Sequence, residues 1–145
     1  MRLTLQTDYA LRSLVFLATA GEAGSTAQVI SDRFRISKSH LVKVLQRLRA
    51  LGYLETTRGR GGGVKLACAP ETIVIGAVVR QTEDDLALVE CFNKQDNSCP
   101  IIGVCGLERK LGEAFAAFLA VLDGCTVADL ALTPGAWARL FPETR

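Results

Sequence analysis

The sequence SKSHLVKVLQRLRALG, residues 37–52, decides how the first half of the chain folds. Its apolar residues recur at helical spacing, which predicts a helix that starts near Ser37, whose hydroxyl can cap it, and ends at Gly52. The buried face of this helix is expected to consist of Leu41, Val44, Leu45 and Leu48. The other face is left for solvent or phosphate and carries Lys38, Ser39, Lys43, Gln46, Arg47 and Arg49.

Two further helices are predicted before this one. The first follows Thr7 or Asp8, either of which is a good N-cap, and closes at Gly21. The second starts at Ser25 and ends before a short turn at residues 35–36. After the third helix, residues 53–57 and 64–67 have strand character, and the basic glycine-rich sequence RGRGGG lies between them. The order of three helices and a hairpin is that of a winged helix-turn-helix.

In such a module the third helix enters the major groove of DNA with its N-terminal residues toward the bases, and the wing can bring an arginine to a minor groove. The expected DNA contacts are Arg12, Ser37, Lys38, Ser39, His40, Lys43, Arg58 and Arg60. A glycine-rich loop can instead cradle a nucleotide phosphate. Residues 58–63 match neither a Walker lysine pattern nor a strand-to-helix context, so we prefer the DNA interpretation.

Charge is distributed unevenly along the chain. Residues 1–66 carry eleven Lys and Arg against four acids, a net charge of +7, whereas residues 67–145 carry six bases against eleven acids, a net charge of −5. A basic half joined to an acidic half indicates that the first half faces a polyanion. The alternative is that these charges belong only to solvated helix faces.

The second half is predicted to begin with a strand-like lead and a buried helix within residues 71–83, followed by an acidic run at residues 83–85 that reads as a solvated helix end. Further on, a long helix carries an apolar seam of Leu107, Leu111, Phe115, Phe118 and Leu122. A lone helix cannot bury such a seam, so we expect the same helix of a second copy to cover it. An intrachain seam against the first helix is the alternative.

The expected fold is therefore mainly α, with a winged helix-turn-helix DNA-binding domain, a long dimerisation helix and a cysteine-rich loop. We divide the chain into a DNA-binding region at 1–70, a loop and dimerisation region at 71–130, and a C-terminal tail at 131–145. We predict that the tail is loosely structured because it contains Pro134, Gly135 and Pro142.

The loop sequence ECFNKQDNSCPIIGVC, residues 90–105, contains three cysteines. Seven residues separate Cys91 from Cys99, and five separate Cys99 from Cys105. Three thiolates at such spacing suit an iron-sulfur cluster or zinc, and both normally require a fourth ligand from elsewhere in this chain or from a second chain. Cys68 and Cys125 are expected to be small buried or half-buried residues.

Composition limits the remaining classes. The 145 residues, 49% of them apolar, suffice for one core, and no apolar run is long enough to span a membrane. The first residues show no export signal, so we expect a cytoplasmic protein whose five cysteines are not disulfides. The chain shows no Ser/His/acid set, no HExxH motif and no nucleotide loop, and we do not expect an enzyme.

Several stretches together resemble one family. They are MRLT at residues 1–4, DYALR at 8–12, SHLVK at 39–43, RGRGGGV at 58–64 and the three-cysteine loop. This ordered set is similar to the bacterial iron-sulfur transcription regulators that include NsrR, IscR and RirA, and the resemblance extends to about Asp129. It implies a homodimeric winged-helix repressor that binds promoter DNA at an inverted repeat and responds to loss or modification of its cluster.

Within that resemblance, Cys91, Cys99 and Cys105 are implied as ligands of a cluster, 4Fe-4S in preference to 2Fe-2S. The IscR-like pattern places a histidine shortly after the third cysteine, whereas this chain has only His40. NsrR-like nitric oxide sensors can use an aspartate donated by the other subunit, and Asp8 stands at the matching position.

Two kinds of alternative remain open. RirA-like iron regulators share the wide first cysteine spacing but resemble Asn at the position of Asp8, which keeps an iron-responsive regulator as the second interpretation. Asp8 can also be only a helix cap. From another class, the chain can be a small iron-sulfur or zinc protein without a regulatory role, although such a protein has no use for a basic winged helix.

Overall fold

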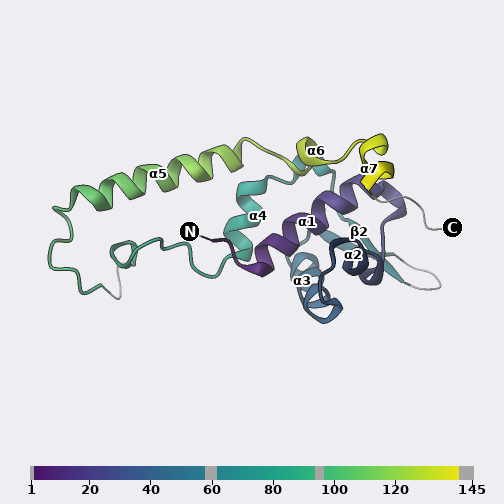
Figure 1. Cartoon of the computed structure of the whole chain (residues 1–145), viewed down its shortest axis with the longest axis horizontal. Coiled ribbons are helices and arrows are strands. Elements are labelled where there is room, and N and C mark those ends of the chain that lie inside the picture. The colour runs from purple at the N-terminus through teal and green to yellow at the C-terminus, as the bar shows by residue number, and fades with distance from the viewer. Residues whose placement is uncertain (1, 58–61, 94–96, 141–145) are drawn as a thin grey trace.

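The computed structural model describes residues 2–57, 62–93 and 97–140 of the chain (Figure 1). It is mainly helical, with one two-stranded antiparallel sheet. The elements are α1 Leu5–Ala20, α2 Ala27–Phe34, α3 Lys38–Ala50, β1 Leu54–Thr57, β2 Gly63–Leu66, α4 Ile75–Thr82, α5 Gly106–Asp123, α6 Val127–Leu130 and α7 Pro134–Leu140, with single 3-10 turns at Gly21–Ala23, Pro70–Thr72 and Glu90–Phe92.

Helix α1 begins one turn earlier than the sequence predicts. Thr4 is its N-cap, with a side-chain oxygen that accepts a hydrogen bond from the backbone N–H of Thr7 at 3.3 Å. Thr7 is itself fully buried, and Asp8 lies within the first turn. The prediction that Thr7 or Asp8 caps the helix is therefore wrong, because a threonine three residues before Thr7 supplies the oxygen that a cap requires.

The helix-turn-helix is formed by α2 and α3. Helix α2 is N-capped by Thr26 rather than Ser25, and its C-cap is Arg35, whose φ of 54° lies in the left-handed region and ends the helix. The buried hydroxyl of Ser31 donates to the carbonyl of Ile36 at 2.6 Å and holds the turn closed. The turn predicted at residues 35–36 is thereby confirmed.

The wing follows α3 as the hairpin of β1 and β2, in which Leu54 pairs with Leu66. Ser25 adds a bridge to Val64, with N–O distances of 2.9 and 2.8 Å. Gly24 has a φ of +59°, and a Cβ on it would lie 2.5 Å from the Val64 carbonyl oxygen, so only glycine fits there without a shift. The wing tip at residues 58–61 lies outside the described residues.

The core joins these helices to α4 and α6. Its fully buried large side chains are Leu14, Leu17, Ile30, Leu41, Leu48, Ile73, Val78, Val79 and Val127. The strand-like lead before α4 pairs with the chain before α6, since the N–H of Val127 donates to the carbonyl of Ile73 and the N–H of Ile75 to that of Cys125. The buried helix predicted within residues 71–83 is confirmed as α4. The region boundaries at 70 and 130 stay predictions.

Helix α5 extends away from this core toward one end of the molecule (Figure 1). It contains no buried residue along its length. Its C-terminal end is held to α4 by Arg80, which donates from both terminal nitrogens to the Asp123 carboxylate at 2.6 and 2.7 Å. Among the described residues no helix is both long and apolar enough to cross a membrane.

The chain after α6 packs on α1. The Trp137 ring makes an edge contact with the Phe16 ring at a centroid distance of 4.7 Å, and the N–H of Leu132 donates to the Thr19 hydroxyl at 3.1 Å. The prediction of a loose tail is wrong for residues 134–140. Pro134 begins a helix here, since proline at the first helical position lacks only an N–H that would be unpaired there anyway.

The buried hydroxyl pair between α1 and α4 gives the first testable prediction. Thr7 Oγ1 donates to Thr82 Oγ1 at 2.9 Å, and Thr82 Oγ1 donates to the carbonyl of Val78 at 2.8 Å. Thr82→Val removes the acceptor and should lower the free energy of unfolding by about 1–3 kcal/mol in urea denaturation. Thr72→Val, at an exposed position, is the control, and an equal loss in both variants would contradict the buried network.

Candidate functional site

The exposed start of α3 is the candidate DNA surface. The side chains of Ser37, Lys38, Ser39, His40 and Lys43 are exposed, while the face that points inward is buried as predicted. Ser37 is the N-cap residue of α3, as predicted, but its hydroxyl bonds to the Ser39 hydroxyl at 2.9 Å and makes no capping bond to the helix.

The remaining predicted DNA residues are placed differently. Arg12 lies on α1, half-exposed, and its guanidinium is engaged by Asp8. Arg58 and Arg60 lie outside the described residues. The structure therefore brings together the α3 residues, and contact of each predicted residue with DNA stays a prediction.

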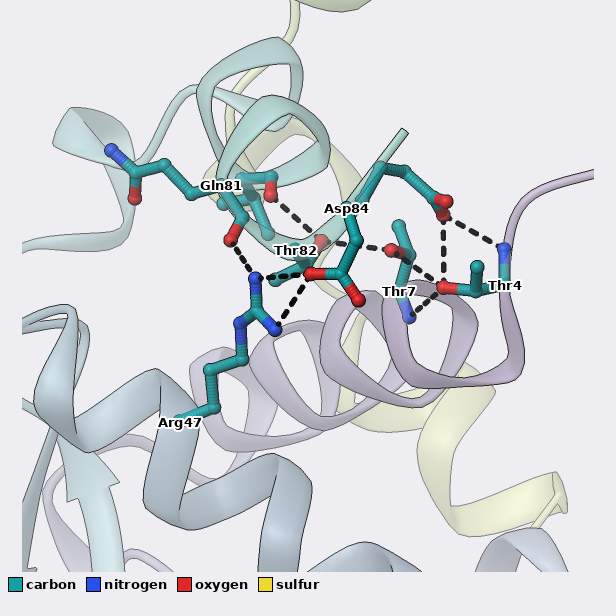
Figure 2. A network of polar contacts seen from close by, with 8 residues as sticks. Thr4, Thr7, Arg47, Gln81, Thr82 and Asp84 are labelled. Carbon is teal, nitrogen blue, oxygen red and sulfur yellow. Dashed lines mark hydrogen bonds and ion pairs between the residues drawn. The ribbon is translucent and has the colours of Figure 1, made fainter. Parts of the chain in front are cut away.

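Arg47, on the last turns of α3, joins this helix to the end of α4 (Figure 2). One terminal nitrogen donates to the backbone carbonyl of Gln81 at 2.8 Å, and both lie 3.2 Å from an Asp84 carboxylate oxygen. The Tyr53 hydroxyl adds a second bond to the Gln81 side chain at 2.8 Å. Sequence patterns placed Arg47 on the solvent or phosphate side, and nothing in them signals a partner 37 residues away.

The acidic run after α4 also binds the start of α1. The Glu83 carboxylate accepts from the backbone N–H of Thr4 at 2.8 Å and from its hydroxyl at 3.0 Å (Figure 2). Together with Asp84, this makes the run a junction between α1, α3 and α4. The prediction of a merely solvated helix end is wrong for Glu83, whereas Asp84 is 80% exposed, as predicted, and also pairs with Arg47.

Asp8 is a surface carboxylate on the first turn of α1. It accepts from Arg12 through both oxygens, at 2.9 and 2.7 Å, in an i to i+4 pair of partly exposed side chains. Such exposed pairs contribute little to stability. Because Thr4 performs the capping, the alternative that Asp8 is only a cap is excluded by the geometry.

The cysteine loop is closed by a contact that the sequence did not reveal. The Glu90 carboxylate accepts from both the backbone N–H and the hydroxyl of Ser98, at 2.7 and 2.6 Å, and these bonds lower the pKa of Glu90. Each partner immediately precedes a cysteine, so the contact ties the chain just before Cys91 to the chain just before Cys99. Cys105 is the N-cap residue of α5.

The three thiols interact electrostatically. The pKa of Cys91 is raised above its usual value, first of all by partial loss of water. The nearby Glu108 carboxylate and the thiols of Cys99 and Cys105 raise it further. A bound metal must displace the proton of such a thiol, and a set of three thiols suits soft metals such as iron or zinc. Among the described residues, however, no three His, Cys, Asp or Glu side chains are close enough to hold a metal. The three thiols are ligands of the kind that a cluster requires, but in this structure they do not lie close enough together to hold one.

The two other cysteines play a smaller part. Cys125 is half-buried, as expected, whereas Cys68 is exposed, which corrects the prediction of burial. Burial away from water raises the pKa of the Tyr53 hydroxyl, and the nearby Cys68, which follows the wing, raises it further.

The apolar seam of α5 is only partly covered within the chain. Leu107 is 65% exposed, and Phe115 contacts the rings of Phe92 and Phe118 at centroid distances of 6.5 and 6.2 Å. A hollow of about 370 Å³ lies between the seam and residues 85–89. Among the described residues the main intrachain partners of α5 are thus α4 and the segment after it, and α1, the partner in the alternative, is not a main one.

Fold and site together define a winged-helix DNA-binding regulator with a cysteine loop. Residues 3–133 match the family described as Rrf2, iron-dependent transcriptional regulators, and the chain belongs to that family. The resemblance inferred from the sequence motifs is confirmed.

Relatives and solved structures agree with this assignment. The chain is 54% identical over 132 residues to the HTH-type transcriptional regulator NsrR of Bacillus subtilis, covering 90% of each chain. It is 49% identical over 146 residues to the regulator of that name from Geobacillus kaustophilus, covering 100% of this chain and 99% of the relative. The structure of CymR, the global cysteine regulator of B. subtilis, matches with a TM-score of 0.72 and 26% identity, over 90% of this chain and 96% of that one. The protein is a DNA-binding transcriptional regulator of the NsrR type.

The exposed face of α3 gives a prediction for DNA binding. Lys43→Ala should weaken binding to specific and random duplexes alike and reduce the slope of log K against log salt by about 1, because one phosphate contact is lost. Arg139→Ala, an exposed arginine in α7, is the matched control. Ser39→Ala should instead alter the preference among duplex sequences, and equal losses on specific and random DNA for Ser39→Ala would contradict its place at the base edges.

Proposed function

We propose that the protein is a repressor that senses nitric oxide through an iron-sulfur cluster bound by Cys91, Cys99, Cys105 and the partner subunit's Asp8. The observation that carries this proposal is the position of Asp8. Its carboxylate is at the surface, on the first turn of α1, and Thr4 performs the capping that would otherwise account for an acid there.

The proposed ligands, three thiolates and one carboxylate, explain why nitric oxide is the proposed signal. Thiolates are soft ligands, and a carboxylate is a harder one, so Asp8 is the ligand most easily displaced. When bound, a four-iron cluster supplies iron that reacts with small neutral molecules such as nitric oxide. The cluster type is part of the proposal, with a two-iron cluster as the alternative.

Asp8 has two competing uses for the same two oxygens. Here both accept from Arg12. If Asp8 bound the partner's cluster, at least one of its oxygens would stop accepting from Arg12. If Asp8 left the cluster, that oxygen would accept from Arg12 again. Asp8 also follows Thr7, which is bonded to the end of α4, where Arg47 of the recognition helix is bound. A change at Asp8 therefore acts on a turn that is connected to the DNA-binding helix.

A dimer is needed for this arrangement. In Figure 1 the loop that leads into α5 lies at the far left end of the molecule, well away from the first turn of α1. This separation supports the proposal that a second copy provides the Asp8. The partly covered seam of α5 is the surface proposed to join the copies, and the two-fold symmetry predicts an inverted-repeat operator with half-sites about 10 base pairs, or a small multiple of that, apart.

An iron-responsive regulator is the second candidate. It is favoured by the description of the family as iron-dependent and by the wide spacing between Cys91 and Cys99. Zinc at the same thiols is the remaining alternative, and a colourless protein after anaerobic purification would indicate it.

Nitric oxide and chelation separate the two regulators. In the protein purified without oxygen, stoichiometric nitric oxide should bleach the visible absorption and release operator DNA, while mild iron chelation should act far more slowly. The reverse ranking, with chelation releasing DNA and nitric oxide leaving the complex intact, would establish the iron sensor instead.

Substitution of the ligands tests the site itself. Each change of Cys91, Cys99 or Cys105 to Ala should abolish cluster retention, since no spare soft ligand remains. Asp8→Ala should keep the cluster, because water or buffer thiol can fill one corner, but make it more labile to nitric oxide or chelator. Asp32→Ala, at an exposed carboxylate of α2, is the control. Identical behaviour of Asp8→Ala and Asp32→Ala would remove Asp8 from the ligand set.

The seam makes a prediction about assembly. Phe118→Glu would bury an unpaired charge at a cost of several kcal/mol if the seam joins two subunits, and should give monomers or insoluble protein. Ala117→Glu, one residue earlier at an exposed position of the same helix, should leave the dimer intact. Analytical ultracentrifugation measures both, and an unaltered dimer for Phe118→Glu would show that the seam serves only this chain.

A further inference from the structure

Arg47 lies one helical turn beyond Lys43 on α3, at the border of the proposed DNA surface. Residues four apart on a helix lie on the same side of it, which is why the sequence pattern assigns both cations to solvent or phosphate. Lys43 is exposed, whereas only 34% of the Arg47 side chain is exposed. The Arg47 guanidinium donates instead to acceptors of its own chain.

Three neighbouring segments supply those acceptors. The Gln81 carbonyl, at the end of α4, accepts from one terminal nitrogen at 2.8 Å, and an Asp84 carboxylate oxygen lies 3.2 Å from both terminal nitrogens (Figure 2). On α1, the Gln6 amide, with its oxygen turned toward Arg47, accepts from Nε at 3.3 Å and from a terminal nitrogen at 2.9 Å. Three bonds to Gln81 and Asp84 and two to Gln6 use the five N–H donors of a guanidinium.

Gln81 is itself held in place by the chain that follows α3. The Tyr53 hydroxyl donates to the side-chain oxygen of Gln81 at 2.8 Å, and the backbone N–H of Tyr53 donates to the Leu48 carbonyl at 3.0 Å. The carbonyl that receives Arg47 therefore belongs to a residue that is fixed from a second direction. A phosphate could bind Arg47 only if some of this network were broken.

These bonds restrain α3 in a way that its buried face cannot. That face consists of leucine and valine side chains, and the attraction between apolar surfaces has no preferred direction. A planar guanidinium, by contrast, requires acceptors that lie in line with its N–H bonds. The contacts of Arg47 therefore fix the rotation of α3 about its own axis relative to α1 and α4.

We propose that Arg47 is a positioning residue for sequence recognition, which acts by holding α3 against α1 and α4 and not by binding DNA phosphate. The inference rests on the proposed contact between the exposed start of α3 and DNA, and it does not depend on a cluster. Ser39 and Lys43 precede Arg47 by about two turns and one turn on the same helix. A rotation of the helix at Arg47 is therefore carried to the side chains that face DNA.

Sequence recognition is the property most sensitive to such a rotation. Bonds to base edges require side chains at fixed positions in the groove, whereas attraction to phosphate depends mainly on charge. A variant that loosens α3 but keeps the charge should therefore lose specific binding and retain non-specific binding. A variant that loses a phosphate contact should weaken both.

Arg47→Lys separates the two roles because it keeps the charge and removes the planar fork. Fluorescence anisotropy at several salt concentrations measures affinity for a duplex selected from a random pool with the wild-type protein, and for a random duplex of the same length. Arg47→Lys should bind the selected duplex about tenfold more weakly, the scale of one hydrogen bond to a charged group, and the random duplex with wild-type affinity and salt slope. Arg139→Lys, at an exposed position of α7, is the control and should match wild type on both duplexes.

Two results with Arg47→Lys would overturn the proposal. One is wild-type affinity for the selected duplex, because a lysine can replace an arginine at a phosphate but not in this network. The other is an equal loss on both duplexes, which indicates a lost phosphate contact or a general loss of folded protein.

Asp84→Ala tests the same contact from a side chain that is 80% exposed, where substitution has little effect on stability. Removing a negative charge should by itself strengthen binding to any duplex. If Asp84 helps to hold Arg47, the selected duplex should instead be bound about threefold more weakly, since the other bonds of Arg47 remain. Asp85→Ala, an exposed neighbour with the same change of charge, is the matched control and should not lower the affinity. Equal affinities of these two variants for the selected duplex would contradict the proposal.

Lys43→Ala distinguishes failure of this inference from failure of the proposed DNA surface. If Lys43→Ala weakens binding to both duplexes while Arg47→Lys and Asp84→Ala behave as wild type, α3 faces DNA and Arg47 has no part in positioning it. If Lys43→Ala has no effect, the exposed start of α3 is not the DNA surface, and both proposals are overturned.

Discussion

A hydrogen bond between two buried hydroxyls, those of Thr7 and Thr82, fixes the first turn of α1 against the last turn of α4. The positions of the two chain segments that continue from Thr7 and Thr82 depend on this bond. One carries Asp8, and the other carries Glu83 and Asp84 toward the cysteine loop. Arg47 joins the recognition helix to the same place through the Gln81 carbonyl and Asp84 (Figure 2). The candidate ligand, the DNA-binding helix and the start of the loop therefore share one junction.

The two halves of the chain differ in how much of their surface is buried. The DNA-binding helices surround a continuous core, whereas α5 has no buried residue and is anchored to α4 through the exposed Arg80–Asp123 pair. That pair lowers the pKa of Asp123 and raises that of Arg80. A loop and helix with so little intrachain burial are suited to be ordered by a second copy and a bound cluster, which is how the proposed sensor would convert ligand loss into movement at α3.

Much of the fold follows from local pattern in the sequence. The helical spacing of Leu41, Val44, Leu45 and Leu48 predicts the buried face of α3, and the glycine-rich stretch marks the wing. What sequence pattern missed depends on long-range partners. Thr4 and not Asp8 caps α1, Arg47 binds residues more than thirty positions away, and Trp137 packs on Phe16 to make a helix of a stretch that reads as a tail. Spacing in the sequence predicts the three cysteines as ligands, which stays a prediction, while the Glu90–Ser98 contact between them has no local signature.

The most direct test of a cluster shared between subunits is a mixed dimer of one Asp8→Ala chain and one Cys91→Ala chain. If Asp8 acts across the interface, the intact cysteines of the first chain meet the intact Asp8 of the second. The account predicts one cluster per dimer, with wild-type absorption per cluster and a wild-type rate of loss to nitric oxide and chelator. A single cluster with the lability of the Asp8→Ala homodimer would contradict it, because ligation would then occur within one chain or without Asp8.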